Sequence, residues 1–272
     1  MKTILLMTDF SENAKNAIKY AINMFGEEVD YLLLNTYIVR ENTGSFLSVS
    51  DKVKAMSEKA MFKELAFIKS EFAQLVNLKI SDVLLRGGAI DGVNQLKEKK
   101  EIDLIVMGTK GASGITKFLV GSVTASVVQE TGLPVLIIPE KEEYVPYKKI
   151  VFATDFSHKV KQELLTPLQY IAQKFKAEVN LLNVQLINDS PSEFNLLGLI
   201  ENVEVTIETI DAKEADVSKD IEQYCKKEEA DMLTVVAHHN TFFEGLFHQS
   251  VSQELIYHAQ LPILALDASY TT

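Results

Sequence analysis

The sequence of 272 residues is poor in cysteine, in long apolar runs and in positive charge. Its single cysteine, Cys225, cannot form a disulfide within the chain and fits a reducing compartment, so we expect a cytoplasmic protein. No apolar run approaches the roughly 20 residues of a transmembrane helix, and the apolar residues 1–7 meet Asp9 too soon for a signal peptide. The sequence therefore predicts neither a membrane span nor a secretory leader.

The charge balance excludes one large class of partner. Acidic residues outnumber basic residues by 38 to 27, which gives a formal net charge of −11. Binding to a nucleic-acid backbone needs a basic surface, so we expect no nucleic-acid partner. A small anion such as ATP is not excluded, because its site is local and the nucleotide can bring Mg²⁺ with it.

An internal repeat divides the chain in two. ILLMTDFS at residues 4–11 returns as IVFATDFS at 150–157, and LPVL at 133–136 returns as LPIL at 261–264. The chain is long enough for two domains of ordinary size, and 47% of its residues are apolar, which is enough for a core in each. We predict domains at 1–141 and 148–268, because KEEYVPY at 141–147 interrupts the apolar pattern.

Strand-like and helix-like patterns alternate in both copies. In the first they predict strands at 2–8, 29–36, 79–86, 103–107 and 134–138, with Gly87 and Gly88 ending the third strand. They also predict a helix that follows an N-cap at Ser11 and ends at 25, further helices at 51–75, 90–99 and 122–130, and a loop at 37–50. In the second they predict strands at 148–154, 178–184, 203–209, 231–236 and 262–266, with a short helix at 190–200. This alternation is typical of an α/β fold with a doubly wound parallel sheet.

A glycine-rich loop follows the fourth predicted strand. The apolar run 104–107 leads into glycines at positions 108, 111, 114 and 121, and a helical pattern begins at Ser122. Glycine lets backbone N–H groups approach phosphate oxygens, and a helix start adds free N–H donors and a positive dipole end. The segment therefore predicts an anion cradle; the alternative is a loop that only needs tight turns.

The spacing of these glycines, G-x2-G-x9-G-[S/T], resembles the nucleotide-binding signature of the universal stress protein family, in its ATP-binding branch. The resemblance implies two tandem five-stranded parallel sheets of the adenine nucleotide alpha hydrolase-like type, each with strand order 3-2-1-4-5. That order places strands one and four side by side where the order reverses, which is where open parallel sheets bind ligands. Residue Asp9 and the Gly108 loop then meet at one crevice.

The resemblance also implies which positions contact the nucleotide. Base and ribose contacts come from the ends of strands one and two, and sugar and phosphate contacts come from the glycine-rich loop and the helix after it. The matching positions are Met7, Thr8, Asp9, Asn35, Thr36, Met107, Gly108, Lys110, Gly111, Gly121, Ser122, Val123 and Thr124. Two alternatives stay open: Asp9 can be a helix-capping residue, and Lys110 can be a solvated loop lysine.

The second copy departs from the signature. Ala237, Asn240 and Gln249 replace the three glycines, and Phe242 and Phe243 add bulk to the loop. Side chains then occupy the places where bare backbone would approach phosphate. We therefore predict that the second half does not bind ATP in the family's manner.

Other sites and chemistries find no support in the sequence. Walker and Rossmann glycine motifs are absent from the expected positions, as is a G-x-S-x-G elbow. His238, His239, His248 and His258 have no carboxylate or thiol partner at the spacing of a zinc site, so we predict no metal site. Cys225 lies in an amphipathic stretch, so we predict that its side chain is buried in the core.

The resemblance implies an ATP-binding, or AMP- or ADP-binding, regulator of a stress response. We identify no catalytic residue, because neither a base for attack on the γ-phosphate nor an acidic pair for Mg²⁺ is evident. Two alternatives remain: a slow ATP hydrolase, and an interaction scaffold that binds no nucleotide. The resemblance further implies a pseudo-dimer in which the two fifth strands pair; further pairing of chains and an unknown protein partner remain open.

Overall fold

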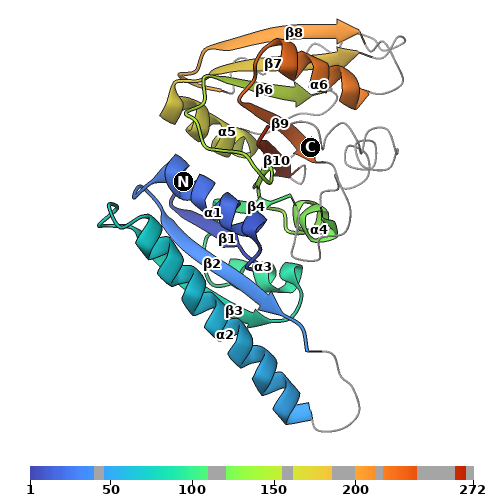
Figure 1. Ribbon diagram of the computed structural model, residues 1–272. Coiled ribbons are helices and arrows are strands. Elements are labelled where there is room, and N and C mark those ends of the chain that lie inside the picture. The colour runs from blue at the N-terminus through green and yellow to red at the C-terminus, as the bar shows by residue number, and fades with distance from the viewer. Residues whose placement is uncertain are drawn as a thin grey trace.

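The computed structural model describes residues 1–39, 46–109, 121–154, 162–185, 200–211, 217–237 and 261–267. Its described strands form one ten-stranded sheet in the order β3-β2-β1-β4-β5-β10-β9-β6-β7-β8. Figure 1 shows the first half of the chain at the bottom and the second half at the top, with the sheet continuing from one to the other.

Both halves alternate strands with helices. The elements of the first half are β1 (Thr3–Met7), α1 (Glu12–Phe25), β2 (Asp30–Tyr37), α2 (Phe46–Glu71), β3 (Lys79–Arg86), α3 (Ala89–Lys97), β4 (Leu104–Gly108), α4 (Ser122–Glu130) and β5 (Val135–Ile138). Those of the second half are β6 (Lys149–Thr154), α5 (Gln162–Phe175), β7 (Glu178–Gln185), β8 (Val205–Asp211), α6 (Val217–Lys227), β9 (Met232–Ala237) and β10 (Ile263–Asp267).

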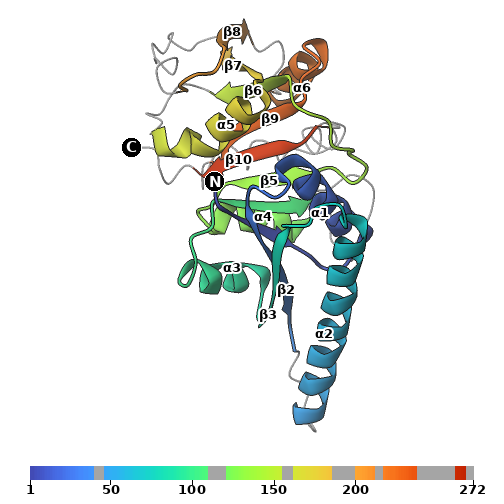
Figure 2. The same ribbon diagram turned by 90° about the vertical axis from the view of Figure 1, so that its left-hand side faces the viewer.

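The predicted strand order is confirmed in the first half. Strand β1 pairs in parallel with β2 and with β4, so the order reverses between β1 and β4. The second half repeats this arrangement, with β6 between β7 and β9. The two fifth strands, β5 and β10, pair antiparallel, with Leu136 opposite Leu264, and they lie side by side at the centre of Figure 2. This pairing joins two five-stranded units into one sheet and covers the edge that each would otherwise expose.

Apolar layers cover both faces of the sheet, which explains why the strands read as nearly continuous apolar runs. On one face, Leu6 and Phe152 pack with residues of α1, α2 and α5. On the other face, Leu5 and Val151 pack with residues of α3, α4 and α6. Cys225 belongs to this second layer and is buried, as expected.

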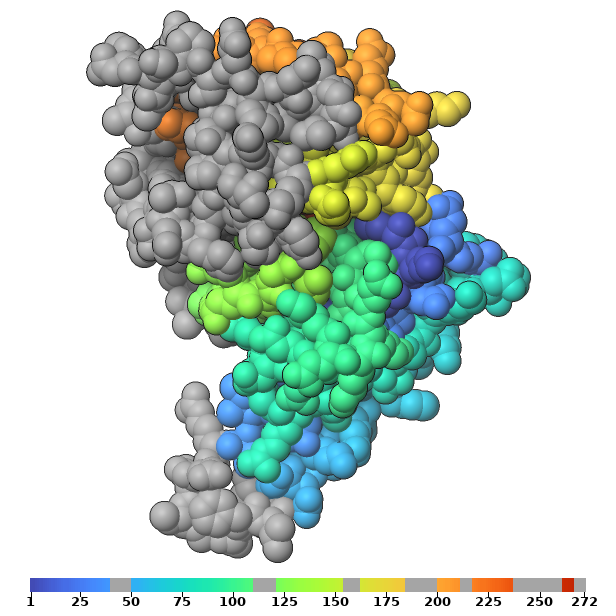
Figure 3. Space-filling view, turned by 180° about the vertical axis from the view of Figure 1, so that it is seen from behind, coloured from blue at the N-terminus to red at the C-terminus, as the bar shows by residue number. Residues whose placement is uncertain are grey.

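The two halves also meet away from the central strands. The Tyr20 hydroxyl of α1 lies 2.9 Å from the Tyr147 hydroxyl in the connecting segment, and both rings are buried. Glu28, after α1, accepts hydrogen bonds from Tyr170 and Lys174 of α5. From behind, Figure 3 shows the yellow surface of the second half against the blue surface of the first.

Two predictions need comment. The helix predicted to begin at residue 51 begins at Phe46, so the predicted loop is too long. Residues 46–50 contain neither glycine nor proline, and extending an existing helix costs far less than starting one. The short helix predicted at 190–200 lies almost wholly outside the described residues. Within the described part of the chain, no helix combines the length and apolar character needed to cross a bilayer.

Candidate functional site

A crevice of about 290 Å³ lies where β1, β2 and β4 end and α3 and α4 begin. All the predicted site residues that the structure describes line it. These residues are Met7, Thr8, Asp9, Asn35, Thr36, Met107, Gly108, Gly121, Ser122, Val123 and Thr124. Lys110 and Gly111 lie outside the described residues. The fold thus gathers positions from four segments at one edge of the sheet, and their contacts with a ligand remain a prediction.

The N-terminus of α4 forms one wall of the crevice. Its N-cap residue is Gly121, which has no side chain with which to cap the helix, and the first helical bond runs from the Ala125 N–H to the Gly121 carbonyl. The N–H groups of residues 122–124 precede that bond and have no acceptor within the helix. Ser122 and Val123 are exposed, so this helix start can offer backbone donors and its positive dipole end to an anion.

The base of the glycine-rich loop is closed by two hydrogen bonds. The Gly121 N–H donates to the Thr109 carbonyl at 2.6 Å, and the Thr124 hydroxyl donates to the Gly108 carbonyl at 3.1 Å. Thr124 is buried, so its hydroxyl holds the start of the loop against α4. The part of Thr124 that remains for a ligand is its backbone N–H.

Gly108 has a structural role that the sequence did not suggest. A Cβ placed on Gly108 would lie 2.7 Å from Oδ1 of Asn13, and 2.9 Å or less from the other atoms of that amide group. Asn13 is buried on α1, and its Nδ2 lies 3.4 Å from Oγ1 of Thr109. Glycine at 108 therefore lets α1 pack against the end of β4, whatever the ligand requires.

The turn that carries Asp9 is held by a series of local hydrogen bonds. Oδ1 of Asp9 accepts from the Ser11 N–H at 3.1 Å, and Oγ of Ser11 accepts from the Ala14 N–H at 3.1 Å. Ser11 is therefore the N-cap of α1, as predicted, and Asp9 braces the residue before the helix. Asp9 remains exposed to the crevice, and a carboxylate can accept several hydrogen bonds, so the bracing bond does not exclude a contact with a ligand.

The side chain of Asn35 fixes the backbone beside Asp9. Its Nδ2 donates to the Thr8 carbonyl at 2.8 Å, and the residue is 6% exposed. Asn183 occupies the same register in the second half, beside Thr154, and is also 6% exposed. In the first half this side chain joins the first two strands, and the second half has the same residue type at the same register.

Several lining residues were missed by the sequence analysis. They are Ala14, Leu34, Ile38, Gly88 and Ala89. Gly88 is the N-cap of α3, so a second helix begins at the crevice, and its N–H donates to Asp91 at 3.0 Å. The pair Gly87-Gly88 was noticed in the sequence only as the end of a strand. Its position directly before a helix was the signal that could have placed it in the site.

Helix α3 approaches the crevice closely because of a glycine. A Cβ on Gly92 would lie 2.5 Å from Cγ2 of Thr36, which lines the crevice at the end of β2. The tight contact sets the distance between α3 and β2. Among the lining residues that the structure describes, Asp9 alone carries a charge, and the others are glycines and apolar or uncharged polar residues.

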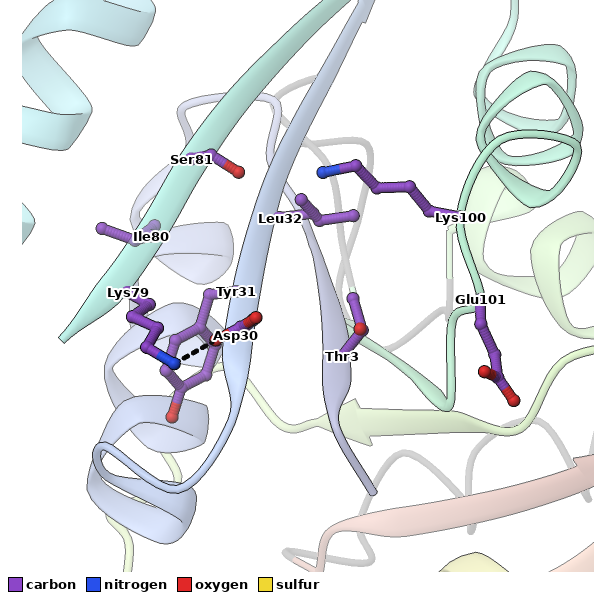
Figure 4. Close-up of a pocket in the computed structure, with 9 residues that line it drawn as sticks. All are labelled: Thr3, Asp30, Tyr31, Leu32, Lys79, Ile80, Ser81, Lys100 and Glu101. Atoms are coloured by element: carbon purple, nitrogen blue, oxygen red, sulfur yellow. Dashed lines mark ion pairs between the residues drawn. The ribbon is translucent and has the colours of Figure 1, made fainter.

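A second cleft, of about 470 Å³, lies at the opposite ends of the strands, near the starts of β1, β2 and β3. Figure 4 shows Lys79 paired with Asp30 on one side and Lys100 and Glu101 on the other. Two positive and two negative side chains line it, and no helix begins there. Ligands of open parallel sheets bind at the carboxyl ends of strands, so the crevice at Asp9 is the stronger candidate.

The corresponding crevice of the second half is largely outside the described residues. Ala237 ends β9 as Gly108 ends β4, but Asn240, Gln249, the two phenylalanines and the four histidines follow it in the part not described. The prediction that this half does not bind ATP therefore stays a prediction. In the described part of the chain, no group of three or more histidine, cysteine, aspartate or glutamate residues could hold a metal ion.

Comparison with known proteins supports the resemblance found in the sequence. The profile of the Universal stress protein family matches residues 1–139 and 197–267. Universal stress protein MJ0531 of Methanocaldococcus jannaschii is 32% identical over 150 residues, which span 52% of this chain and 85% of that protein. MJ0577 of the same organism is 28% identical over 158 residues, covering 52% of this chain and 96% of that protein.

A solved structure matches nearly the whole chain. The crystal structure of a universal stress protein from Archaeoglobus fulgidus superposes with a TM-score of 0.74 and covers 97% of this chain and 98% of that one. Its sequence is 19% identical, so the match shows the fold, including the joining of two similar halves, and nothing about ligands.

Proposed function

This chain belongs to the universal stress protein family, and from that premise we propose that its first half, residues 1–141, binds ATP, or AMP or ADP. Binding would make the protein a nucleotide-dependent regulator in a stress response in the cytoplasm. The observation that carries the proposal is the open N-terminus of α4, which faces a crevice at the ends of β1 and β4. Helix starts after glycine-rich loops are established sites for phosphate groups.

The lining residues divide into two ends that suit a nucleotide. The backbone donors at Ser122–Thr124 suit the phosphate groups of a nucleotide, and they lie directly after the glycine-rich loop. Met7, Leu34 and Met107 offer an apolar surface on which a base can lie, and Asp9 can accept a hydrogen bond from a ribose hydroxyl or an adenine amino group. When bound with the nucleotide, Mg²⁺ would neutralise phosphate charge.

The described lining favours binding over rapid hydrolysis. Asp9 is its only ionisable side chain, and one of its oxygens already accepts the Ser11 N–H. No histidine, lysine or second carboxylate of the described lining could activate a water molecule for in-line attack on the γ-phosphate. We therefore expect hydrolysis to be slow or absent, and we propose that the second half, residues 148–268, acts without a nucleotide of its own.

The test uses the first residue of α4. Ser122→Pro removes one N–H donor and one hydroxyl from the crevice, yet proline is favoured at the first position of a helix, and Gly121 before it is extended, with ψ of 147°. Ser122→Ala removes the hydroxyl alone. Titration calorimetry should show ATP binding to the wild type, weaker binding to Ser122→Pro, and an intermediate or unchanged affinity for Ser122→Ala.

Each alternative has its own result in this experiment. Equal affinity of the wild type and Ser122→Pro would show that α4 does not hold the phosphates. No heat with ATP, ADP or AMP for the wild type would favour the scaffold function. Single-turnover release of phosphate that is lost in Ser122→Pro would favour the slow hydrolase.

A further inference from the structure

A carboxylate is buried next to the crevice without being part of its lining. Glu64 of α2 is 3% exposed and is the only acidic residue among the buried residues that the structure describes. Burying a carboxylate costs free energy unless hydrogen bonds and nearby charges compensate, so its contacts indicate what it does. An apolar residue at this place would avoid that cost and still fill the layer beside Met61 and Ile68.

Glu64 is linked by hydrogen bonds to the turn that carries Asp9. Oγ1 of Thr8 lies 3.3 Å from Oε1 of Glu64 and 2.9 Å from the Phe10 N–H. An ionised carboxylate can only accept, so the Thr8 hydroxyl donates to Glu64 and accepts from Phe10. Because Glu64 accepts the hydroxyl hydrogen of Thr8, the Thr8 oxygen is left to act as the acceptor for the Phe10 N–H.

The backbone that receives this support is strained. Phe10 has a φ of 65°, in the left-handed region that residues other than glycine rarely adopt. Such a conformation persists only where its surroundings enforce it. Asp9 lies between Thr8 and Phe10, so the conformation of this turn decides where its carboxylate stands in the crevice.

We propose that Glu64 is a positioning residue of the nucleotide site, which holds the turn at residues 8–10 through the Thr8 hydroxyl and so presents Asp9 to the sugar or base of the ligand. The inference rests on the proposed nucleotide function and extends it to a residue of α2. It also assigns a role to α2, whose central part packs beside the site while contributing nothing to the lining of the crevice.

The charges around Glu64 predict how the affinity for nucleotide depends on pH. Burial is the main cause that raises the pKa of the Glu64 carboxyl, and Lys15 of α1 opposes it, while Glu12 and Asp9 raise it further. The ionised form accepts the stronger hydrogen bond from Thr8, whereas the protonated form brings a hydrogen of its own to the contact. Affinity for nucleotide should therefore fall as the pH drops through this raised pKa.

The experiment compares variants of Glu64 and Thr8 by calorimetry with ATP from pH 8 down to the lowest pH at which all the variants stay folded. At the upper pH, Glu64→Ala should weaken binding about tenfold, which corresponds to ~1.4 kcal/mol. Glu64→Gln keeps an acceptor for Thr8 and should stay within about twofold of the wild type, a difference of less than ~0.5 kcal/mol. Its affinity should also vary less with pH than that of the wild type, and this comparison removes the titration of ATP itself.

Two further variants complete the design. Thr8→Val removes both the bond to Glu64 and the acceptor of the Phe10 N–H, so it should weaken binding at least as much as Glu64→Ala, and adding Glu64→Gln to it should change nothing more. Glu58→Gln alters an exposed carboxylate on the same helix, paired with Lys54 at 3.7 Å, and should bind ATP as the wild type does. A Glu64→Ala protein that binds ATP normally, or a Glu64→Gln protein that keeps the wild-type pH profile, would overturn the proposal.

A measurement without ligand separates this inference from the proposed function. Hydrogen exchange at the Phe10 amide, followed by NMR in the free protein, should be about fivefold faster in Glu64→Ala and unchanged in Glu58→Gln, since a lost bond of ~1 kcal/mol has roughly that effect. If the exchange rate responds but no nucleotide binds, the proposed function fails and the link between Glu64 and the turn stands. If nucleotide binds and neither exchange nor affinity responds, the positioning role of Glu64 is wrong.

Discussion

Asn13 of α1 occupies the space that a side chain at position 108 would need, with its Oδ1 2.7 Å from the site of a Cβ on Gly108. The contact joins the first helix to the end of the fourth strand, and both segments border the crevice. A glycine that matches a nucleotide-binding signature is thus also required by the packing of the protein.

We predict that Gly108→Ala is destabilising because of Asn13. The added methyl group would overlap the buried amide of Asn13, which must shift to make room, and overpacking of this kind costs about 1–3 kcal/mol. Asn13→Ala removes all three clashing atoms. In the Asn13→Ala background, Gly108→Ala should therefore cause little further loss of stability. Urea unfolding of the four proteins measures this, and additive effects would contradict it.

A second glycine gives an independent prediction. Gly92→Ala lies within α3, where alanine normally stabilises a helix by up to about 1 kcal/mol. Here the new Cβ would lie 2.5 Å from Cγ2 of Thr36, so we expect lower stability and weaker nucleotide binding instead. Thr36→Ser deletes that methyl group while keeping the hydroxyl, and in this background Gly92→Ala should be neutral or stabilising. Thermal unfolding and calorimetry together test both effects.

The paired hydroxyls of Tyr20 and Tyr147 predict a non-additive result at the contact between the halves. Burial raises the pKa of both phenols, so each stays neutral and able to donate. Removing one hydroxyl leaves the other without its partner at a cost of about 1–3 kcal/mol, whereas removing both leaves an apolar contact. Tyr20→Phe and Tyr147→Phe should each destabilise the protein, and the double variant should be less destabilised than the sum. Equilibrium denaturation gives the coupling energy.

Glu28 predicts a dependence of stability on pH at the same contact. The hydrogen bond from Lys174 lowers the pKa of its carboxyl below the ordinary value of 4.5. A lowered folded-state pKa stabilises the protein above the unfolded pKa, and this contribution is lost as the pH falls through the folded pKa. Because the pair is partly exposed, with side-chain exposures of 17% for Lys174 and 59% for Glu28, we expect less than about 1 kcal/mol.

The variant Glu28→Gln tests that expectation. It should cost a little stability at pH 7 and progressively less as the pH falls through the lowered pKa of the wild-type carboxyl, because that carboxyl then becomes neutral as well. Lys174→Met should show the same dependence on pH, and the two together should not add. A loss that stays the same across the whole acidic range in which the protein remains folded would show that Glu28 acts through packing and not through its charge.

The sequence was sufficient for much of the fold because its signals are local. Strand β3 and helix α4 occupy the predicted residues, and the other described elements whose bounds were predicted differ by no more than two residues at each end, except α2, which begins five residues and ends four residues before the predicted positions. The N-cap at Ser11 was readable because capping depends on a polar side chain directly before an apolar-periodic segment. The start of α2 at Phe46 was not, because nothing in 46–50 marks a helix boundary.

The sequence by itself determined the repeat and the alternation of strands and helices, since these follow from periodicity, and its resemblance to the family implied most of the described positions that line the crevice. Only the tertiary structure decided why Gly108 must lack a side chain and where Gly88 and Glu64 stand relative to Asp9. Each of these relationships joins residues far apart in the chain. Their contacts depend on how helices pack on the sheet, and no local pattern of residues encodes that packing.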